Sequence, residues 1–276
     1  MNTPEPTVSP QEKALNEALS RALSRRSALG LIGSAFGGMV LAGCNVGTTD
    51  DTSSTTTSGS SSTDSSTVSN AACALTPEGE IGPYFTDDSA SGYNRSNILS
   101  NLDGSNTQSG IPLTLHLYVY DFDNSCAAVV GAQVDIWHCN ADGVYSNESV
   151  EGTTGQNWLR GYQITDSNGL VTFTTIFPGW YSGRTTHIHL RIRSAYNAAS
   201  STSDGSNTTQ LFFPQTTVDT IDTTVSPYKT EGVNPTTNAG DRVYAVQTRG
   251  KMELTLSGDA SNGYVASCIL GLPITA

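Results

Sequence analysis

Alternating polar and apolar residues mark the strands of this chain, and the clearest alternation covers residues 186–193. Successive side chains of a strand point to opposite faces, so His187 and His189 share one face. Ile188 and Leu190 then point to the other face, where we expect a hydrophobic core. The pattern predicts a strand that is buried on one side and carries two imidazoles on the other.

Similar runs, rich in Val, Ile, Thr and aromatic residues, predict an all-β domain without a long helix. Residues 166–169, Asp-Ser-Asn-Gly, predict a hairpin turn between two strands. The polar segments 195–207 and 216–241 are predicted to be surface loops. The further predicted strands cover residues 113–122, 132–139, 159–165, 170–177, 209–213, 242–247, 251–257 and 264–270.

The N-terminal segment has the pattern of an export signal. Arg25 and Arg26 precede an apolar run, residues 29–43, that is too short to span a bilayer comfortably. A basic pair before such a run is typical of an export signal, here of the twin-arginine type. The run ends in Leu-Ala-Gly before Cys44, which resembles the bacterial lipoprotein box. We interpret residues 1–44 as a signal segment, with lipidated Cys44 as the expected membrane anchor.

A polar tract separates this signal from the rest of the chain. Residues 45–70 contain 17 Ser or Thr, a composition that buries little apolar surface and predicts a flexible tether. Residues 71–276 are then expected to form one β domain. The predicted location is outside the cytoplasm, on a membrane, and the sequence leaves open whether that is the periplasm or the cell surface.

The charge of the chain narrows its possible partners, and its cysteines indicate disulfide bonds. The formal net charge is −12 and the sequence pI is about 4.5, which argues against a nucleic-acid partner, because phosphate binding needs a basic face. Four cysteines in an exported domain suggest two disulfides, and the sequence does not separate the three possible pairings. These cysteines are Cys73, Cys126, Cys139 and Cys268.

The histidine pair is the strongest candidate for chemistry. Two imidazoles on one strand face can bind one metal ion, and Tyr181 and Arg184 lie just upstream. The alternative is an ordinary strand with two surface histidines. His116 lacks such a partner motif and is expected to be structural. His138, which follows Trp137, is expected to be a hydrogen-bonding residue near the ligands or a surface residue, and not a ligand itself.

Further motifs lie along the chain in a fixed order. Residues 135–145 read Asp-Ile-Trp-His-Cys-Asn-Ala-Asp-Gly-Val-Tyr, residues 159–163 read Leu-Arg-Gly-Tyr-Gln, and residues 178–181 read Pro-Gly-Trp-Tyr. Residues 184–189 read Arg-Thr-Thr-His-Ile-His, and Thr-Pro-Glu with Gly-Pro-Tyr-Phe lies near the start of the domain. Together these motifs resemble those of the intradiol ring-cleavage dioxygenases, such as the catechol and protocatechuate dioxygenases.

The resemblance implies a β-sandwich with one non-haem Fe(III) per chain. It implies that the iron ligands are Tyr145, Tyr181, His187 and His189. The implied reaction cleaves a catechol-type diol between its hydroxylated carbons with O2, giving a cis,cis-muconate-type product. In this reaction Tyr145 would accept a substrate proton, and Arg184 would stabilise negative charge on the substrate. The implied substrate-binding residues are Pro83, Tyr84, Arg184 and Gln210.

The sequence also departs from the family. Only two residues separate Tyr181 from Arg184, fewer than in the protocatechuate enzymes, which leaves the identity of the diol open. No counterpart of the helical dimerisation region of the catechol enzymes precedes the domain, so the oligomeric state is open too. The alternatives are a non-catalytic exported β-sandwich that binds carbohydrate or aromatic polymer, and a zinc or copper site on the same histidines.

Overall fold

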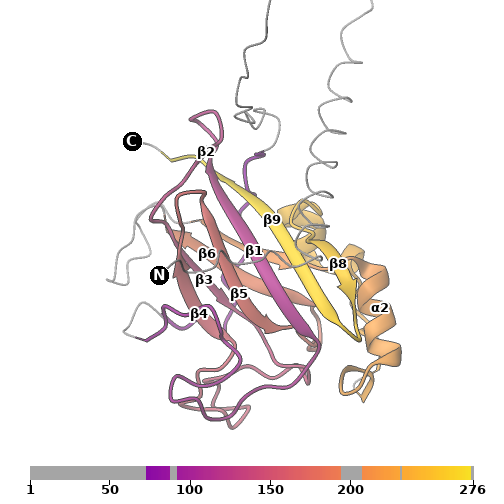
Figure 1. Ribbon diagram of the computed structural model, residues 1–276. Helices are drawn as coiled ribbons and strands as arrows, with labels where there is room; N and C mark the ends of the chain where they lie inside the picture. Colours follow the sequence, from indigo (N-terminus) through magenta and orange to yellow (C-terminus); the bar gives the residue numbers. More distant parts are fainter. Residues whose placement is uncertain (1–72, 88–91, 194–206, 231, 275–276) are drawn as a thin grey trace, which may run out of the picture.

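The computed structural model describes residues 73–87, 92–193, 207–230 and 232–274. They form a sandwich of two β-sheets, with helical segments beside one edge (Figure 1). The all-β prediction is therefore confirmed for the sandwich. The predicted signal segment, Cys44 and the predicted tether lie outside the described residues. Within the described part of the chain, no helix is long and apolar enough to cross a membrane.

Each sheet combines pairs of consecutive strands with strands that are far apart in sequence. The first sheet runs in the order β2-β1-β9-β8, with β5 also paired to β1, and the second in the order β4-β3-β6-β7. β1 pairs in parallel with β9 and antiparallel with β5. The strands are β1 (Pro112–Asp121), β2 (Ala127–Ala128), β3 (Gln133–Trp137), β4 (Arg160–Ile164), β5 (Leu170–Ile176), β6 (His187–Arg193), β7 (Asn207–Phe212), β8 (Thr255–Asp259) and β9 (Gly263–Leu272).

The core lies between the two sheets. Ile188, Leu190 and Ile192 of β6 are fully buried in it, as their alternation predicted. Leu115 and Leu117 of β1 meet them from the first sheet and are also fully buried. Burial of such side chains contributes about 1.5–3 kcal/mol each relative to exposure, so this face fixes the register of β6.

The opposite face of β6 is also buried, because another segment covers it. The amide of Gly79 donates to the carbonyl of Thr208, and Nε2 of Gln210 donates to the carbonyl of Glu80. Further along, the ring of Phe85 packs edge-on against Trp137. Residues 76–87 therefore lie over the histidine face of the second sheet, which excludes the interpretation of two surface histidines.

Two predicted elements in the C-terminal part are wrong. The predicted loop 216–241 contains the helix α2 (Gln215–Thr224), whose buried residues Val218, Ile221 and Asp222 recur at helical spacing. It also contains the 3-10 turns η1 (Tyr228–Thr230) and η2 (Asn238–Gly240). The predicted strand 242–247 is instead a π-helix, η3 (Val243–Thr248).

The predicted hairpin at residues 166–169 is also wrong, although the turn itself forms. Gly169 donates its amide to the carbonyl of Asp166, and Asn168 donates to the Asp166 carboxylate. The flanking strands β4 and β5 belong to different sheets. The turn is therefore a corner that takes the chain from one sheet to the other.

One disulfide forms among the described residues, rather than two. Cys73 bonds to Cys126, which ties the start of the described domain to the β1–β2 connection. Cys139 keeps a buried thiol that donates to the carbonyl of Gly179, and the Cys268 thiol donates to the carbonyl of Ile269. The predicted second bridge does not form: Cys139 follows β3 of the second sheet, and Cys268 lies on β9 of the first.

Candidate metal centre

The two histidines of β6 bring their ring nitrogens together. Nε2 of His187 and Nε2 of His189 are 3.1 Å apart. Nδ1 of His187 lies 2.6 Å from the carbonyl oxygen of Thr185, to which it donates, so Nε2 of that ring carries a lone pair. Burial lowers the pKa of His187 to about 3 and that of His189 well below its ordinary value, so both rings are neutral. Neutral imidazoles are the form that binds metals.

Tyr181 and Tyr145 approach the histidine pair from two turns. The hydroxyl of Tyr181 is 3.4 Å from Nε2 of His187. The rings of Tyr145 and Tyr181 pack edge-on at 5.7 Å, and those of Tyr145 and His189 at 6.1 Å. The structure thus brings together all four side chains that the sequence predicted as ligands.

Close backbone contact holds the two tyrosine turns side by side. Gly179 donates its amide to the carbonyl of Asn140, with N and O 3.0 Å apart. A Cβ at Gly143 would collide with the carbonyl of Trp180, and one at Gly179 would collide with the carbonyl of Ala141. Both glycines are therefore required where these turns meet, which explains why each tyrosine follows a glycine closely in the sequence.

The environment of the two phenols is apolar. Burial raises the pKa of Tyr145 well above 10, with smaller contributions from Cys139 and Tyr181. Burial also raises the pKa of Tyr181 to about 12, although the positive charge of Arg184 opposes this rise. Among the described residues, the polar group that acts on the Tyr145 hydroxyl is the Tyr181 hydroxyl, and no further hydrogen bond satisfies it. Two buried phenol oxygens beside two neutral imidazoles fit a cation that would share all of them.

The donor set also indicates the kind of cation. Within the described residues, no group of three or more His, Cys, Asp or Glu side chains comes together. A metal at the histidine pair would therefore take phenolate oxygens as its anionic ligands. Metal–imidazole bonds are about 2.0–2.1 Å, so nitrogens 3.1 Å apart are close enough for one ion to bind both.

Tyr84 and Pro83 lie in the segment that covers this cluster. The ring of Tyr84 stacks on Tyr145 with centroids 4.2 Å apart, and meets Tyr181 edge-on at 5.6 Å. Gly82 has φ of +74°, and a Cβ there would lie 2.7 Å from Cε1 of His189. The backbone therefore approaches the second histidine closely at Gly82, and exposed Pro83 follows in a turn.

Arg184 is held beside the cluster by two partners. Nε of Arg184 donates to Oδ2 of Asp241 at 2.8 Å, and Nη2 donates to Oε1 of Gln210. Gln210, predicted as a substrate-binding residue, therefore contacts Arg184, and it faces His189 across the β6–β7 pair. Asp241 had no role in the sequence prediction, because nothing in its local sequence connects it with Arg184.

Arg160 is a second residue whose role the sequence did not show. It is buried, and its Nε and Nη2 donate to Ser146 Oγ and to the Ser146 carbonyl, both at 2.7 Å. Its Nη1 donates to the carbonyl of Tyr84, also at 2.7 Å. Arg160 thus joins the residue after Tyr145 to the residue that stacks on Tyr145. Its place in the Leu-Arg-Gly-Tyr-Gln motif was the available signal.

The remaining histidines lie outside the cluster. His138 is buried, with Nδ1 2.8 Å from the carbonyl of Cys139 and Nε2 2.7 Å from Oγ1 of Thr175. His116 is near Thr172 across the β1–β5 pair. His138 is therefore a buried hydrogen-bonding residue and not a surface one, and neither histidine joins the cluster.

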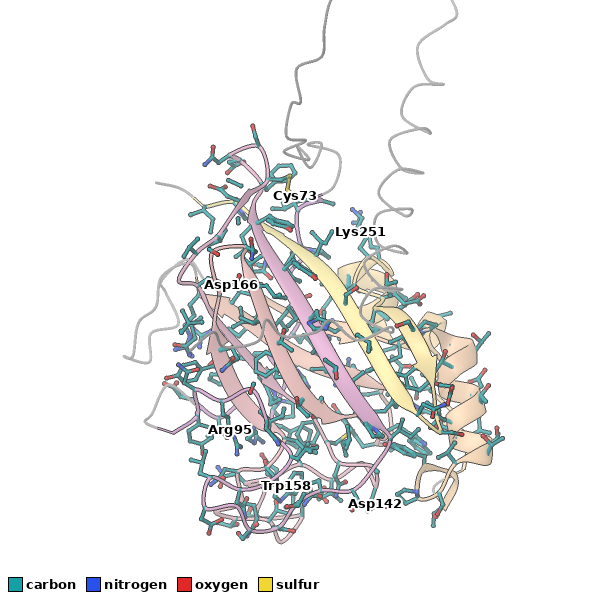
Figure 2. All side chains as sticks on the ribbon, in the orientation of Figure 1. Cys73, Arg95, Asp142, Trp158, Asp166 and Lys251 are labelled. Atoms are coloured by element: carbon teal, nitrogen blue, oxygen red, sulfur yellow. A yellow bond between two sulfur atoms is a disulfide. The ribbon has the colours of Figure 1, made fainter. Side chains whose placement is uncertain are left out.

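In Figure 2 the side chains of Trp158 and Asp142 lie at the loop end of the sandwich, far from Cys73 at the other end.

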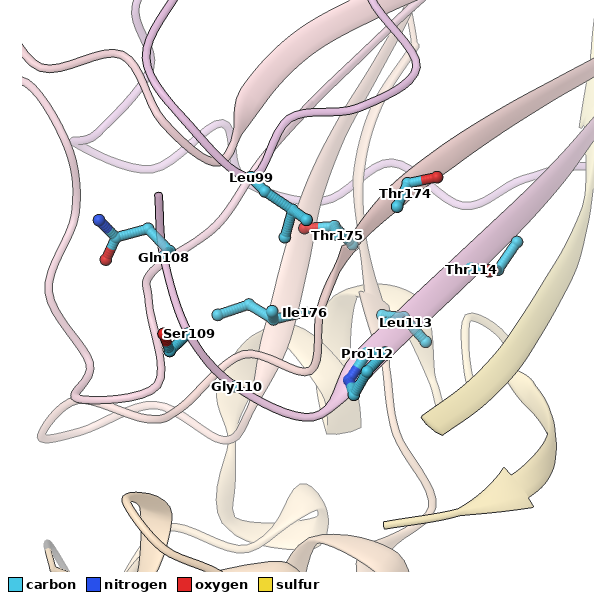
Figure 3. Close-up of a pocket in the computed structure, with 10 residues that line it drawn as sticks. All are labelled: Leu99, Gln108, Ser109, Gly110, Pro112, Leu113, Thr114, Thr174, Thr175 and Ile176. Atoms are coloured by element: carbon cyan, nitrogen blue, oxygen red, sulfur yellow. The ribbon is translucent and has the colours of Figure 1, made fainter. Parts of the chain in front are cut away.

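A separate pocket of ≈ 250 Å³ lies where β1 begins and β5 ends (Figure 3). Leu99, Gln108, Thr114, Thr174 and Ile176 contribute to its lining. None of the predicted site residues lines it, so it is distinct from the tyrosine–histidine cluster.

Comparisons with known proteins agree with this arrangement. The family model described as Dioxygenase matches residues 81–233, a range that contains every predicted ligand and substrate-binding residue. A catechol 1,2-dioxygenase of Acinetobacter baylyi is 31% identical over 106 residues, which are 38% of this chain and 32% of that protein. The chain thus spans about a third of the length of that curated relative.

Solved structures resemble a larger part of the chain. An intradiol ring-cleavage dioxygenase from Tetranychus urticae has 30% sequence identity and a TM-score of 0.61, over 74% of this chain and 96% of that one. The dioxygenase domain of a dioxygenase carbohydrate-binding protein fusion from the cellulolytic bacterium Streptomyces has 25% identity and a TM-score of 0.51. It is matched over 73% of this chain and 100% of that one. The chain belongs to the intradiol ring-cleavage dioxygenase family.

Proposed function

We propose that this protein is an intradiol ring-cleavage dioxygenase that takes one ferric ion per chain and cleaves a catechol-type diol. The bond between the two hydroxylated carbons breaks, both atoms of O2 enter the product, and each of these carbons becomes a carboxyl group. The product is of the cis,cis-muconate type. The observation that supports the proposal is the meeting of Tyr145, Tyr181, His187 and His189 in one buried cluster.

The chemistry of the donors favours ferric iron over zinc or copper. Two phenolates are hard, anionic ligands that suit a trivalent ion. When bound, Fe(III) supplies a Lewis acid that accepts phenolate and catecholate oxygens and draws electron density from the diol ring. Phenols as deeply buried as these would stay protonated unless a cation compensated their charge, because burial raises the pKa of both.

The side chains around the ion would bind and orient the diol, accept its proton and exclude water. Tyr145, whose hydroxyl neighbours that of Tyr181, would accept a proton from the diol at its phenol oxygen. Thr185 holds His187 in the tautomer that leaves Nε2 available. Arg184 would donate to the negative charge that develops on the substrate. Tyr84 covers Tyr145 and keeps water from it.

Metal analysis and product analysis of the full chain test the proposal. After expression with iron, we expect one iron per chain, a visible tyrosinate-to-iron absorption band, O2 uptake with catechol and a muconate product. His189→Ala should remove iron and activity. His138→Ala, which removes a buried histidine outside the cluster, should keep the iron. Zinc or no metal under iron-replete expression would refute the proposal, and a yellow semialdehyde would show cleavage beside the diol instead.

For residues 1–70 we propose export and anchoring. The twin-arginine pair and Cys44 support a lipoprotein whose domain, residues 71–276, is tethered outside the cytoplasm by the Ser/Thr tract. A diol and O2 would then be met outside the cytoplasm.

A further inference from the structure

The guanidinium of Arg184 is bound along one side only. Its Nε donates to Oδ2 of Asp241 at 2.8 Å. Its Nη2 donates to Oδ1 of Asp241 at 3.4 Å and to Oε1 of Gln210. Within the described residues, Nη1 of Arg184 has no hydrogen-bond acceptor. The side chain is 19% exposed. Asp241 and Gln210 therefore fix the plane of the guanidinium and leave one nitrogen with two N–H groups to meet an anion.

Asp241 itself is buried and accepts hydrogen bonds from four residues. Its Oδ2 accepts from Nε of Arg184 and from the amide of Thr185 at 2.9 Å. Its Oδ1 accepts from the amides of Val243 and Tyr244, at 2.8 and 3.0 Å. Burial alone would raise the pKa of Asp241, but the bonds from Arg184, Thr185 and Tyr244 hold it below its ordinary value. Asp241 is therefore ionised, and its charge is matched by Arg184.

The same carboxylate links two parts of the proposed centre. Thr185, which donates to Asp241, accepts the Nδ1 proton of His187 through its carbonyl. Asn234 donates from its side chain to the carbonyl of Arg184 at 2.9 Å, which adds a second bond from the same C-terminal loop. The segment that enters β6 is thus fixed from the loop that leads to η3.

Without Asp241, Arg184 would have another anion close by. Tyr181 belongs to the same turn, because the amide of Arg184 donates to the carbonyl of Tyr181, with N and O 3.3 Å apart. A guanidinium that was free to rotate would pair with the phenolate of Tyr181 and withdraw it from a metal. When Asp241 fixes its guanidinium, Arg184 can donate to the substrate instead.

We propose that Asp241 is a positioning residue for the ring-cleavage reaction: it holds Arg184 so that Nη1 is presented to the substrate and kept away from the tyrosine ligands. This inference rests on the proposed function and adds to it a residue that lies beyond the range matched by the family model.

Asp241→Asn is the direct test. Asparagine has one carbonyl oxygen, which accepts at most two of the four donors, and its amide hydrogens oppose the others. In the iron-loaded full chain, kcat for catechol should fall by roughly 10–100-fold with a smaller change in KM, since the loss is in charge stabilisation. In an Arg184→Ala background the same substitution should cost nothing further.

A second readout does not depend on activity. Phenylglyoxal modifies accessible guanidinium groups, and mass spectrometry of the peptide that contains Arg184 gives the rate at this site. In the full-length protein, with or without iron, Asp241→Asn should make Arg184 react several-fold faster. Asp259→Asn is the control, because the Asp259 carboxylate also accepts backbone amides, those of Ser261 and Asn262, but in the turn between β8 and β9 and without contact to Arg184. It should leave both the rate of modification and kcat unchanged.

The outcomes separate the two proposals. Wild-type modification rate and wild-type kcat in Asp241→Asn would overturn the positioning role. So would an equal loss from Asp241→Asn with and without Arg184, because Asp241 would then act through the general fold. If the wild-type protein cleaved no diol, the proposed function would fail, while the modification rates would still show whether Asp241 holds Arg184. Asp241→Glu, which keeps the charge but displaces the guanidinium, replaces the asparagine variant if that does not fold, and the same non-additivity is expected.

Discussion

The ring of Tyr84 stacks on the ring of Tyr145, with centroids 4.2 Å apart and planes inclined by 22°. Tyr84 belongs to the segment over the second sheet, whereas Tyr145 follows β3, so the stack joins two segments that are distant in sequence. The stack covers the phenol of Tyr145, whose hydroxyl neighbours that of Tyr181 in the buried cluster. Tyr84 is therefore expected to contribute to stability and to the exclusion of water.

Tyr84→Ala should lower the free energy of unfolding by roughly 1–3 kcal/mol, because a half-buried aromatic ring and its two ring contacts are lost. Tyr84→Phe keeps the ring and should stay within about 0.5 kcal/mol of the wild type. Urea unfolding of the three proteins gives the comparison. Equal losses for Phe and Ala would show that the hydroxyl, and not the stack, carries the contribution.

Arg160→Lys should weaken the proposed centre although it preserves the charge. Lysine cannot bind Ser146 and the Tyr84 carbonyl together as the planar fork of arginine does, so the turn after Tyr145 loses its anchor. We expect a loss of about 2–4 kcal/mol in unfolding free energy and a reduced iron content. Arg95→Lys is the control for a general loss of packing around Arg160, because Arg95 binds the backbone carbonyls of Ser100, Asn157 and Arg160 but none in the tyrosine turns. A variant at Arg160 that kept full iron content would exclude this role.

The sequence could predict the parts of the site that depend on local pattern. Alternation in residues 186–193 placed His187 and His189 on one face because a strand has a two-residue period. The tyrosine turns were recognisable because glycine is required where their backbones meet, at Gly143 and Gly179. Long-range contacts carry no such pattern. Asp241 is separated from Arg184 by 57 positions, and only the folded chain joins them.

The errors have the same origin. Residues 166–169 have turn chemistry that suits a hairpin and a sheet-to-sheet corner equally, since a turn does not record which strands it connects. The helix α2 is rich in Thr, which has a low helix propensity, and tertiary contacts of Val218 and Ile221 override it. The strand predicted at 242–247 failed because Asp241 accepts the amides of Val243 and Tyr244 and starts a helical turn there.

Asp222 should make the stability depend on pH. Burial raises its pKa to about 6, with Asp219 adding to the rise and the amide of Asn234 opposing it. Between about pH 4 and 6 the folded protein then binds the proton more strongly than the unfolded chain, so the free energy of unfolding falls as pH rises through this window. Asp222→Asn should be more stable than the wild type above pH 6, by about 1–2 kcal/mol after solvent screening, and equal to it below pH 4. Urea unfolding at pH 4 and 7 measures this, and a constant difference between the proteins would contradict it.

The Cys73–Cys126 disulfide should stabilise the domain by restricting the unfolded chain. The two cysteines are separated by 53 positions, for which loop-closure entropy gives about 4 kcal/mol. A variant with both cysteines replaced by serine should lose stability of this order, whereas Cys139→Ser removes a thiol that is not in the bridge. Thermal unfolding with and without a reducing agent tests this. The reducing agent should lower the unfolding midpoint of the wild type and of Cys139→Ser, and leave that of the double variant unchanged.

The last prediction concerns Cys44, which lies outside the described residues. The apolar run ending in Leu-Ala-Gly before this cysteine, and the Ser/Thr tract after it, support lipidation followed by a flexible tether. A single acyl chain gives only marginal membrane binding, so stable anchoring requires at least two chains on the cysteine. Mass spectrometry of the membrane fraction should therefore show a mature protein that begins at Cys44 and carries a diacylglyceryl group. Cys44→Ser should shift the protein out of the membrane fraction, while catechol cleavage by the released domain stays at the wild-type rate, because the tether separates the anchor from the centre. Wild-type protein that was soluble and began at another residue would refute the anchor and leave the proposed enzyme activity unaffected.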